Sequence, residues 1–148
     1  MRRVLMIGAA LFSLTAMAGE VSKNVNFQLD KWIELEVTDG PVTLHRIRIE
    51  KISAGGLTKS KLFRPGNSEN LQEIQIQLEF SNDSSRDWEA HIDLGWYDGA
   101  GKLIDGYRDK ENLDESENHD LATVTLSTLK YGIEAAKKLK FTIKFERD

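Results

Sequence analysis

The sequence predicts an all-β fold, an antiparallel β-sandwich of about seven or eight short strands with one short helix. Three observations support this prediction. Apolar and polar residues alternate with a period of two over most of the chain, turn signals rich in Gly, Asn, Asp and Pro separate the alternating runs, and a helical period is almost absent. A small open barrel is the alternative that the same pattern allows.

The first 18 residues have the pattern of a secretory signal peptide. Two arginines follow Met1, an apolar stretch runs from Val4 to Leu14, and small residues end the segment at Ala18. This apolar run is shorter than the roughly 20 residues that a membrane span needs. We therefore expect cleavage after Ala18, a periplasmic or extracellular protein, and one domain over residues 19–148. An uncleaved anchor or a buried N-terminal helix is the alternative.

The composition excludes several classes of function. The 148 residues include 20 Lys and Arg, 24 Asp and Glu, and no Cys, and the formal net charge is −4. An acidic chain is a poor partner for nucleic acid or for an anionic membrane surface. Without cysteine there is no thiol catalysis, no thiolate zinc site and no iron–sulfur ligation. We expect no cofactor, and no membrane insertion after signal-peptide removal.

The first half of the chain contains three alternating runs. Their apolar members are Val25, Phe27 and Leu29, then Ile33, Leu35 and Val37, then Val42, Leu44, Ile47 and Ile49. Asp39-Gly40-Pro41 predicts the turn between the second run and the third. The parity of the third run switches between Leu44 and Ile47, which indicates a β-bulge. Turn signals follow at Gly55-Gly56 and Pro65-Gly66.

The second half holds the clearest strands. The apolar positions are Ile74, Ile76, Leu78 and Phe80, then Trp88, Ala90, Ile92, Leu94 and Trp96, with further strands at 103–107, 122–126 and 139–145. Asp98–Gly101 predicts a hairpin turn. The period breaks near residues 130–138, where we expect the short helix. Lys140 and Lys144 on the polar side of the last strand predict a protected sheet edge.

One hairpin carries a family resemblance. It reads Trp96-Tyr97-Asp98-Gly99-Ala100-Gly101 and follows an Asn-containing turn at residues 81–84. This aromatic-Tyr-Asp-x-x-Gly pattern resembles the FxLYD-type domains of bacterial envelope proteins, although Leu94-Gly95-Trp96 replaces the Phe-x-Leu lead-in of that family. The resemblance implies an immunoglobulin-like sandwich outside the cytoplasm and no particular chemistry. Residues 124–145 are also similar to the strand, helical turn and strand of immunoglobulin domains.

An acidic segment extends from Asp105 to Asp120. Its main interpretation is a solvated surface loop, because runs of charge are usually exposed. Calcium binding is the alternative, since hard cations take carboxylate and carbonyl oxygens from flexible loops. The calcium candidates are Asp109, Glu111, Asp114, Asn118 and Asp120. The segment lacks the Gly and the Glu that complete a calcium loop of the EF-hand type.

Aromatic and histidine side chains are the other candidates. Trp88 and Trp96 share the inward parity of their strand and are expected in the core. The remaining candidates for recognition of a partner or a sugar ring are Tyr97, His91, Trp32 and Tyr107. No two histidines stand at spacings of two or four residues, so the sequence predicts no local metal site.

No catalytic motif is present. The chain contains neither Gly-x-Ser-x-Gly nor Ser-x-x-Lys, and no glycine-rich phosphate loop precedes a helix. We therefore expect a non-enzymatic, exported module for protein interaction or envelope assembly. A domain that binds a small ligand or carbohydrate is the first alternative, and a calcium-dependent protein or metal-dependent enzyme is the second.

Overall fold

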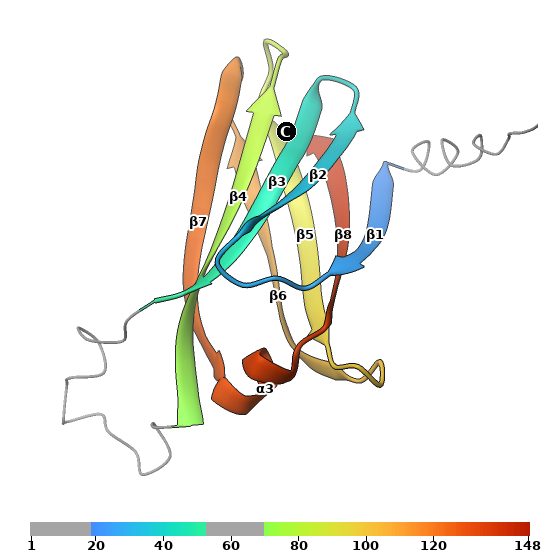
Figure 1. The fold of residues 1–148 in the computed structure, drawn as a ribbon. Helices are drawn as coiled ribbons and strands as arrows, with labels where there is room; N and C mark the ends of the chain where they lie inside the picture. Colours follow the sequence, from blue (N-terminus) through green and yellow to red (C-terminus); the bar gives the residue numbers. More distant parts are fainter. Residues whose placement is uncertain (1–18, 53–69) are drawn as a thin grey trace, which may run out of the picture.

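A computed structural model describes residues 19–52 and 70–148, which form two four-stranded antiparallel sheets packed face to face (Figure 1). The first sheet has the order β1 (Glu20–Asn26), β8 (Lys138–Arg147), β5 (Trp88–Tyr97) and β6 (Leu103–Leu113). The second has the order β2 (Trp32–Asp39), β3 (Val42–Lys51), β4 (Leu71–Asn82) and β7 (Glu117–Leu129). The predicted sandwich is confirmed. The predicted signal peptide and the turn signals at Gly55 and Pro65 lie outside the described residues.

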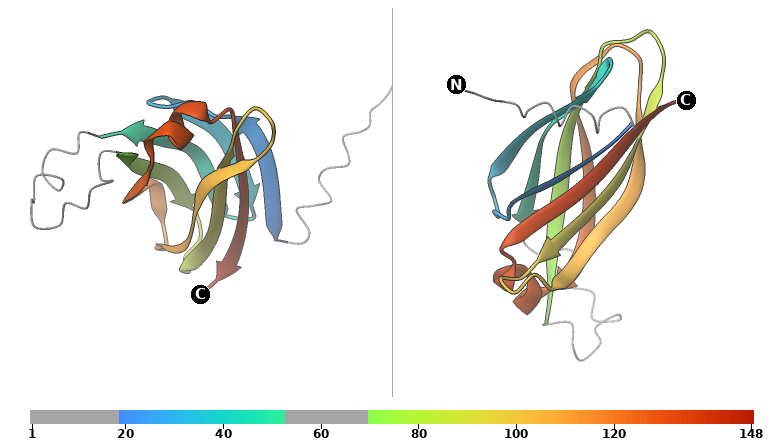
Figure 2. Two further views of the ribbon diagram at one scale, coloured as in Figure 1. Left: turned by 90° about the horizontal axis from the view of Figure 1, so that it is seen from below. Right: turned by 90° about the vertical axis from the view of Figure 1, so that its right-hand side faces the viewer.

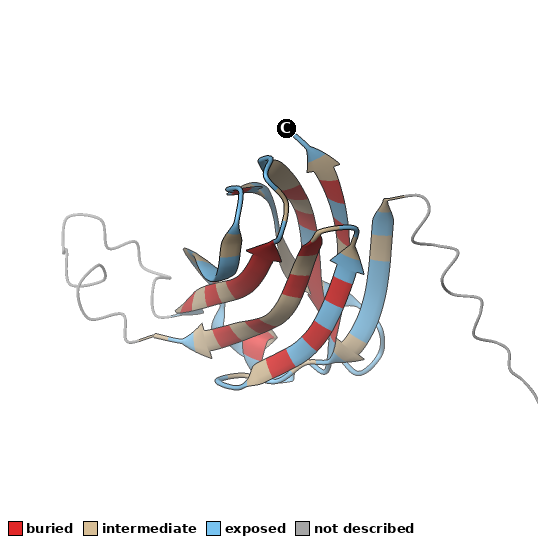
Figure 3. Ribbon diagram, turned by 90° about the horizontal axis from the view of Figure 1, so that it is seen from above, coloured by how far each residue is buried: buried red, intermediate tan, exposed pale blue. Residues whose placement is uncertain are grey.

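The core is built by the predicted alternation. Buried residues alternate with exposed ones along β2 and with half-buried ones along β3, as Figure 3 shows. The largest fully buried side chains come from both sheets and include Trp96, Phe141, Ile47, Ile76 and Ile143. Each such aliphatic or aromatic side chain contributes about 1.5–3 kcal/mol through burial. Trp96 is a core residue as predicted, whereas Trp88 at the start of β5 is only partly buried.

A bulge in β3 confirms the predicted parity switch, and a second bulge in β2 was not predicted. The register of β3 against β4 shifts between Leu44 and Arg46, and that of β2 against β3 shifts between Glu34 and Val37. Glu36 within the β2 bulge has a positive φ of 48°. The extra residues bring Glu36 and His45 together, with His45 Nδ1 3.1 Å from Glu36 Oε1.

The expectation of a loop at the acidic segment is wrong. β6 continues to Leu113 and β7 begins at Glu117, so only three residues form the turn. The β6 ladder extends to the pair of Leu113 with Trp88, and these backbone hydrogen bonds hold the segment extended. Asn82, which is fully buried, secures the turn because its amide donates to the carbonyls of Leu113 and Asp114 at 3.1 Å each.

The expectation that the last strand is an edge is also wrong. β1 pairs with β8 along its whole length, from Glu20 opposite Lys144 to Asn26 opposite Lys138. β8 is therefore an inner strand, and its lysines project from the outer face of the first sheet. The sequence pattern did not indicate β1, because the predicted alternation begins at Val25, whereas β1 ends at Asn26 and is mostly polar.

A short helix joins the two sheets. The predicted helix is confirmed as α3 (Lys130–Ala135), between β7 of the second sheet and β8 of the first. It lies across one end of the sandwich (Figures 1 and 2), and Ile133 anchors it in the core with 1 % of its surface exposed. Leu129 at its N-terminus forms no side-chain capping bond. Within the described residues, no helix has the length and apolarity to span a bilayer.

Candidate functional site

The outer face of the first sheet carries the candidate site. Strand pairing places outward side chains in rows that cross all four strands. One row contains Asn24, Lys140, Gly95 and Gly106. Because two glycines face each other there, the middle of the sheet carries no side chains of its own.

This glycine pair forms the floor of an open hollow of about 570 Å³. The neighbouring rows form its walls, with Tyr97 and Leu103 on one side and the ion pair of Asp93 and Arg108 on the other. The Arg108 Nη2 atom donates to Asp93 Oδ2 at 2.9 Å. Lys140 and Thr142 of β8 complete the lining.

Tyr97 leans over the floor of the hollow. A Cβ atom placed on Gly95 would lie 3.2 Å from Tyr97 Cε1 and 3.1 Å from Leu103 Cδ1. Leu103 is 57 % exposed, which is unusual for a large aliphatic side chain in a strand. Tyr97 thus lies on the outer face of β5, beside an apolar neighbour that the sequence did not indicate.

The hollow is part of a longer groove. A second depression shares Tyr97 and Lys140 with it, and a third shares Asp93, Arg108 and Thr142. No carboxylate of the described residues lies within 4.0 Å of the Lys140 ammonium group. The groove thus offers an aromatic ring, an apolar side chain and a cation that no carboxylate of residues 19–52 or 70–148 pairs with.

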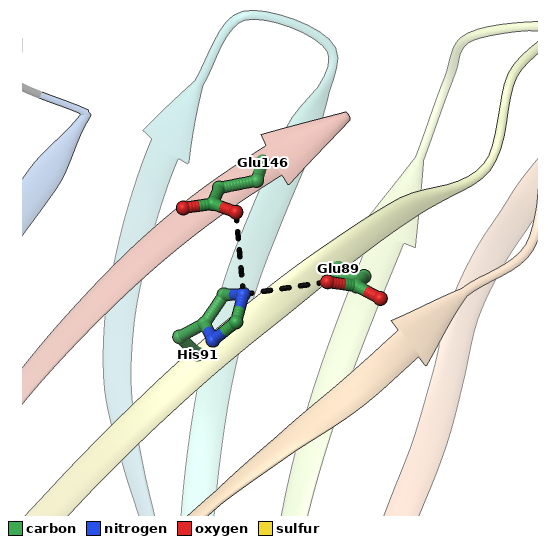
Figure 4. A group of neighbouring side chains, drawn as sticks. All are labelled: Glu89, His91 and Glu146. Carbon is green, nitrogen blue, oxygen red and sulfur yellow. Dashed lines mark ion pairs between the residues drawn. The ribbon is translucent and has the colours of Figure 1, made fainter. Parts of the chain in front are cut away.

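His91 lies at the far end of this groove, between two carboxylates. Its Nε2 atom is 3.4 Å from Glu89 Oε1 and 3.5 Å from Glu146 Oε1 (Figure 4). The other oxygen of each carboxylate forms an ion pair with a lysine. Lys110 Nζ lies 3.2 Å from Glu89 Oε2, and Lys144 Nζ lies 3.0 Å from Glu146 Oε2. The hydrogen bond from Lys144 lowers the pKa of the Glu146 carboxyl.

The remaining recognition candidates lie elsewhere. Trp32 is on the outer face of the second sheet, where the guanidinium groups of Arg46 and Arg48 lie 4.2 and 4.7 Å from its ring centre. Tyr107 has the inward parity of β6 and packs against the core. Burial, together with the nearby Asp109 carboxylate, raises the pKa of Tyr107 to about 12. Neither residue joins Tyr97 and His91.

The calcium candidates do not converge. Asp109 and Glu111 lie on β6, Asp114 lies in the following turn, and Asn118 and Asp120 lie on β7. Burial and the neighbouring Asp109 raise the pKa of Glu111. Across residues 19–52 and 70–148, the one group of at least three potential metal ligands is Glu89, His91 and Glu146. The calcium alternative therefore gains no support from the arrangement of these residues.

A polar cluster on the second sheet was not predicted. His45 and His119 stack with ring centres 4.1 Å apart, although 74 positions separate them in sequence. His119 Nδ1 is 2.6 Å from Glu79 Oε2, and Arg46 Nε donates to Glu79 Oε1 at 3.0 Å. Burial opposes ionisation of Glu79, but these two hydrogen bonds prevail and lower its pKa. Only strand pairing brings these residues together, so no local pattern indicated them.

This cluster contains a hydrogen-bonded Glu36, His45 and Ser81. His45 Nε2 lies 2.8 Å from Ser81 Oγ, and its Nδ1 lies 3.1 Å from Glu36. A carboxylate, an imidazole and a hydroxyl joined in this order resemble the acid, base and nucleophile of a hydrolase triad. Ser81, however, is 5 % exposed, and its Oγ also accepts the backbone N–H of His119 at 2.9 Å. These hydrogen bonds link strands β2, β3, β4 and β7, and Ser81 has little exposed surface.

Comparison with known proteins adds little to this geometry. No protein-family model and no curated protein sequence matches the chain, so the FxLYD-type resemblance is not confirmed. A crystal structure of a DUF1425 family member from Shewanella sp. pv-4 aligns over 79 % of this chain and 93 % of that one, with 11 % identity and a TM-score of 0.36. The Avr2 effector of Fusarium oxysporum aligns over 88 % and 90 %, with 10 % identity and a TM-score of 0.31. Similarity at this level carries no argument about function.

Proposed function

We propose that this protein is an exported, non-enzymatic binding module whose binding surface is the outer face of the first sheet. The observation that carries the proposal is the groove floored by Gly95 and Gly106, where Tyr97 and Leu103 lie beside Lys140. Exposed aromatic side chains in a concave, rigid setting are typical of recognition sites.

The charge of the groove favours an acidic segment of a partner protein. Lys140 has no carboxylate partner among the described residues, and Lys138 is bound only to the neutral Asn26 amide at 2.9 Å. A partner carboxylate would satisfy these ammonium groups, while an apolar partner side chain would cover Leu103 and the Tyr97 ring. Charge complementarity of this kind steers association and fixes register.

Affinity capture from an envelope extract tests the proposal. Tyr97→Ala and Lys140→Glu are the test variants. Tyr131→Ala and Lys130→Glu are the matched controls, because both residues are exposed on α3 and Tyr131 is 74 % exposed. We expect one protein to be enriched by the wild type and by both controls, and to be lost with both test variants. Equal enrichment by all five proteins would refute the assignment of the face.

Binding of a small polar ligand is a second candidate. The hollow of about 570 Å³ falls within the range of roughly 300–1,000 Å³ that is usual for small-molecule sites. Measuring the melting temperature during a sugar titration distinguishes a small ligand from a partner protein. A ligand that binds only the folded state raises the melting temperature. A rise that Tyr97→Ala removes and Tyr131→Ala retains would favour the small ligand.

Export is tested separately. Cell fractionation and N-terminal sequencing should find a chain that begins at Gly19 outside the cytoplasm, which is the product of cleavage after Ala18. An intact N-terminus in the cytoplasmic fraction would refute it.

A further inference from the structure

We propose that Glu89, His91 and Glu146 form a site for a divalent transition-metal ion, with zinc as the best match to the ligand set. This proposal stands independently of the proposed binding function, since none of the three residues lines the glycine-floored hollow.

The first argument is the position of the His91 nitrogen. Nε2 is buried and forms no hydrogen bond of ordinary length, although the side chain as a whole is 42 % exposed. Its distances of 3.4 and 3.5 Å to the two carboxylate oxygens exceed those of ordinary N–H···O hydrogen bonds, about 2.7–3.2 Å. A buried nitrogen that lies between two anionic oxygens, slightly too far from each for an ordinary hydrogen bond, is an unusual arrangement in a folded protein.

The second argument is that these distances suit a shared metal ion. Bonds of about 2.0–2.1 Å to a tetrahedral centre place ligand atoms roughly 3.3–3.4 Å apart. Both distances from His91 Nε2 are already close to this value. The three ligand atoms all lie within 4.8 Å of one another, and the exposed Glu146 side chain can close the remaining distance by rotation.

The third argument comes from the strands. Glu89 and His91 are two residues apart on β5 and face the same side, while Glu146 on β8 lies directly opposite Glu89. Like charges directly opposite each other destabilise a sheet unless they are compensated. Lys110 and Lys144 bind one oxygen of each carboxylate and leave the other directed at His91. The lysines therefore orient the two acids around a common point.

The ligand types identify the class of metal. An imidazole nitrogen with two carboxylates suits zinc and similar ions, whereas calcium and magnesium prefer oxygen alone. Three protein ligands leave one position of a tetrahedral ion free. A metal held here would therefore be open to a fourth ligand at the surface.

Zinc titration of the untagged full-length chain by calorimetry tests the site. His91→Gln and Glu146→Gln are the test variants, and His119→Gln is the control because His119 also pairs with a glutamate, on the opposite sheet. We expect one zinc ion per chain for the wild type and the control, undiminished by excess calcium. The test variants should weaken binding by more than the roughly 10- to 100-fold that changes around metal ligands cost.

Unfolding curves in EDTA should coincide for the wild type and both test variants, since these side chains lie on the outer face. Zinc should raise the melting temperature of the wild type and not of the test variants. Absence of saturable binding by the wild type up to about 1 mM zinc would overturn the proposal. Binding that both His91→Gln and Glu146→Gln retain would also overturn it.

Discussion

The pairing of Gly95 with Gly106 makes a sharp prediction, because the two glycines differ in what surrounds them. A Cβ atom on Gly106 would lie 2.3 Å from the backbone oxygen of Leu94, which the sheet holds in place. A Cβ atom on Gly95 would meet only the ends of the Leu103 and Tyr97 side chains, at 3.1 and 3.2 Å. Those ends can move into the open groove, whereas the Leu94 carbonyl cannot move without breaking the ladder.

The magnitudes follow from this difference. Overpacking costs about 1–3 kcal/mol, and we place Gly106→Ala at the upper end, about 3 kcal/mol. For Gly95→Ala, the lower strain is offset by the roughly 0.5–1 kcal/mol that alanine gains over glycine within a strand. Urea unfolding should therefore separate the variants by at least about 2 kcal/mol, or roughly 6–10 °C in melting temperature. Equal destabilisation, or greater loss from Gly95→Ala, would refute the described packing of the groove floor.

Three further predictions concern stability. Asn82→Ala should cost at least about 3 kcal/mol in urea unfolding, because its buried amide bonds to Ser84 and Arg86 in the turn after β4 and to the carbonyls of Leu113 and Asp114 at the turn after β6. A loss below about 1 kcal/mol would contradict this role. Ile133→Ala should cost about 2–5 kcal/mol by opening a cavity beneath α3, and an unchanged unfolding midpoint would argue against that anchor. Glu79→Gln should destabilise most above pH 4.5, because the folded-state pKa of Glu79 is lowered by His119 and Arg46 and its contribution is lost as pH falls through that value. If the loss of unfolding free energy caused by Glu79→Gln grew as the pH fell, the predicted direction of the pH dependence would be wrong.

Much of the fold follows from local sequence pattern. The alternation around Ile76 and Trp96 predicts their strands and their burial, and the parity switch after Leu44 predicts the bulge. The acidic residues from 108 to 120 gave a wrong prediction of a loop, because their charge does not reveal the strand pairing that keeps this segment extended. The polar strand Glu20–Asn26 misleads for the opposite reason, since its stability comes from pairing with β8 and little from its own apolar residues.

The site is less predictable than the fold. Tyr97 and His91 stand out from parity alone, because their strand has one clear polar face. The hollow depends on Gly95 meeting Gly106, and the metal group depends on Glu89 meeting Glu146. Both pairs depend on the register between neighbouring strands, which cannot be predicted from the spacing of residues within one strand.

A photocrosslinking amino acid at position 97, introduced in the cell that produces the protein, tests the assigned binding face most directly. The same amino acid at position 131 is the control, because Tyr131 is more exposed but lies on α3, away from the groove. The account predicts one discrete crosslinked partner from position 97 that Lys140→Glu abolishes, and none from position 131. Equal crosslinking from both positions, or crosslinking that Lys140→Glu leaves unchanged, would contradict it.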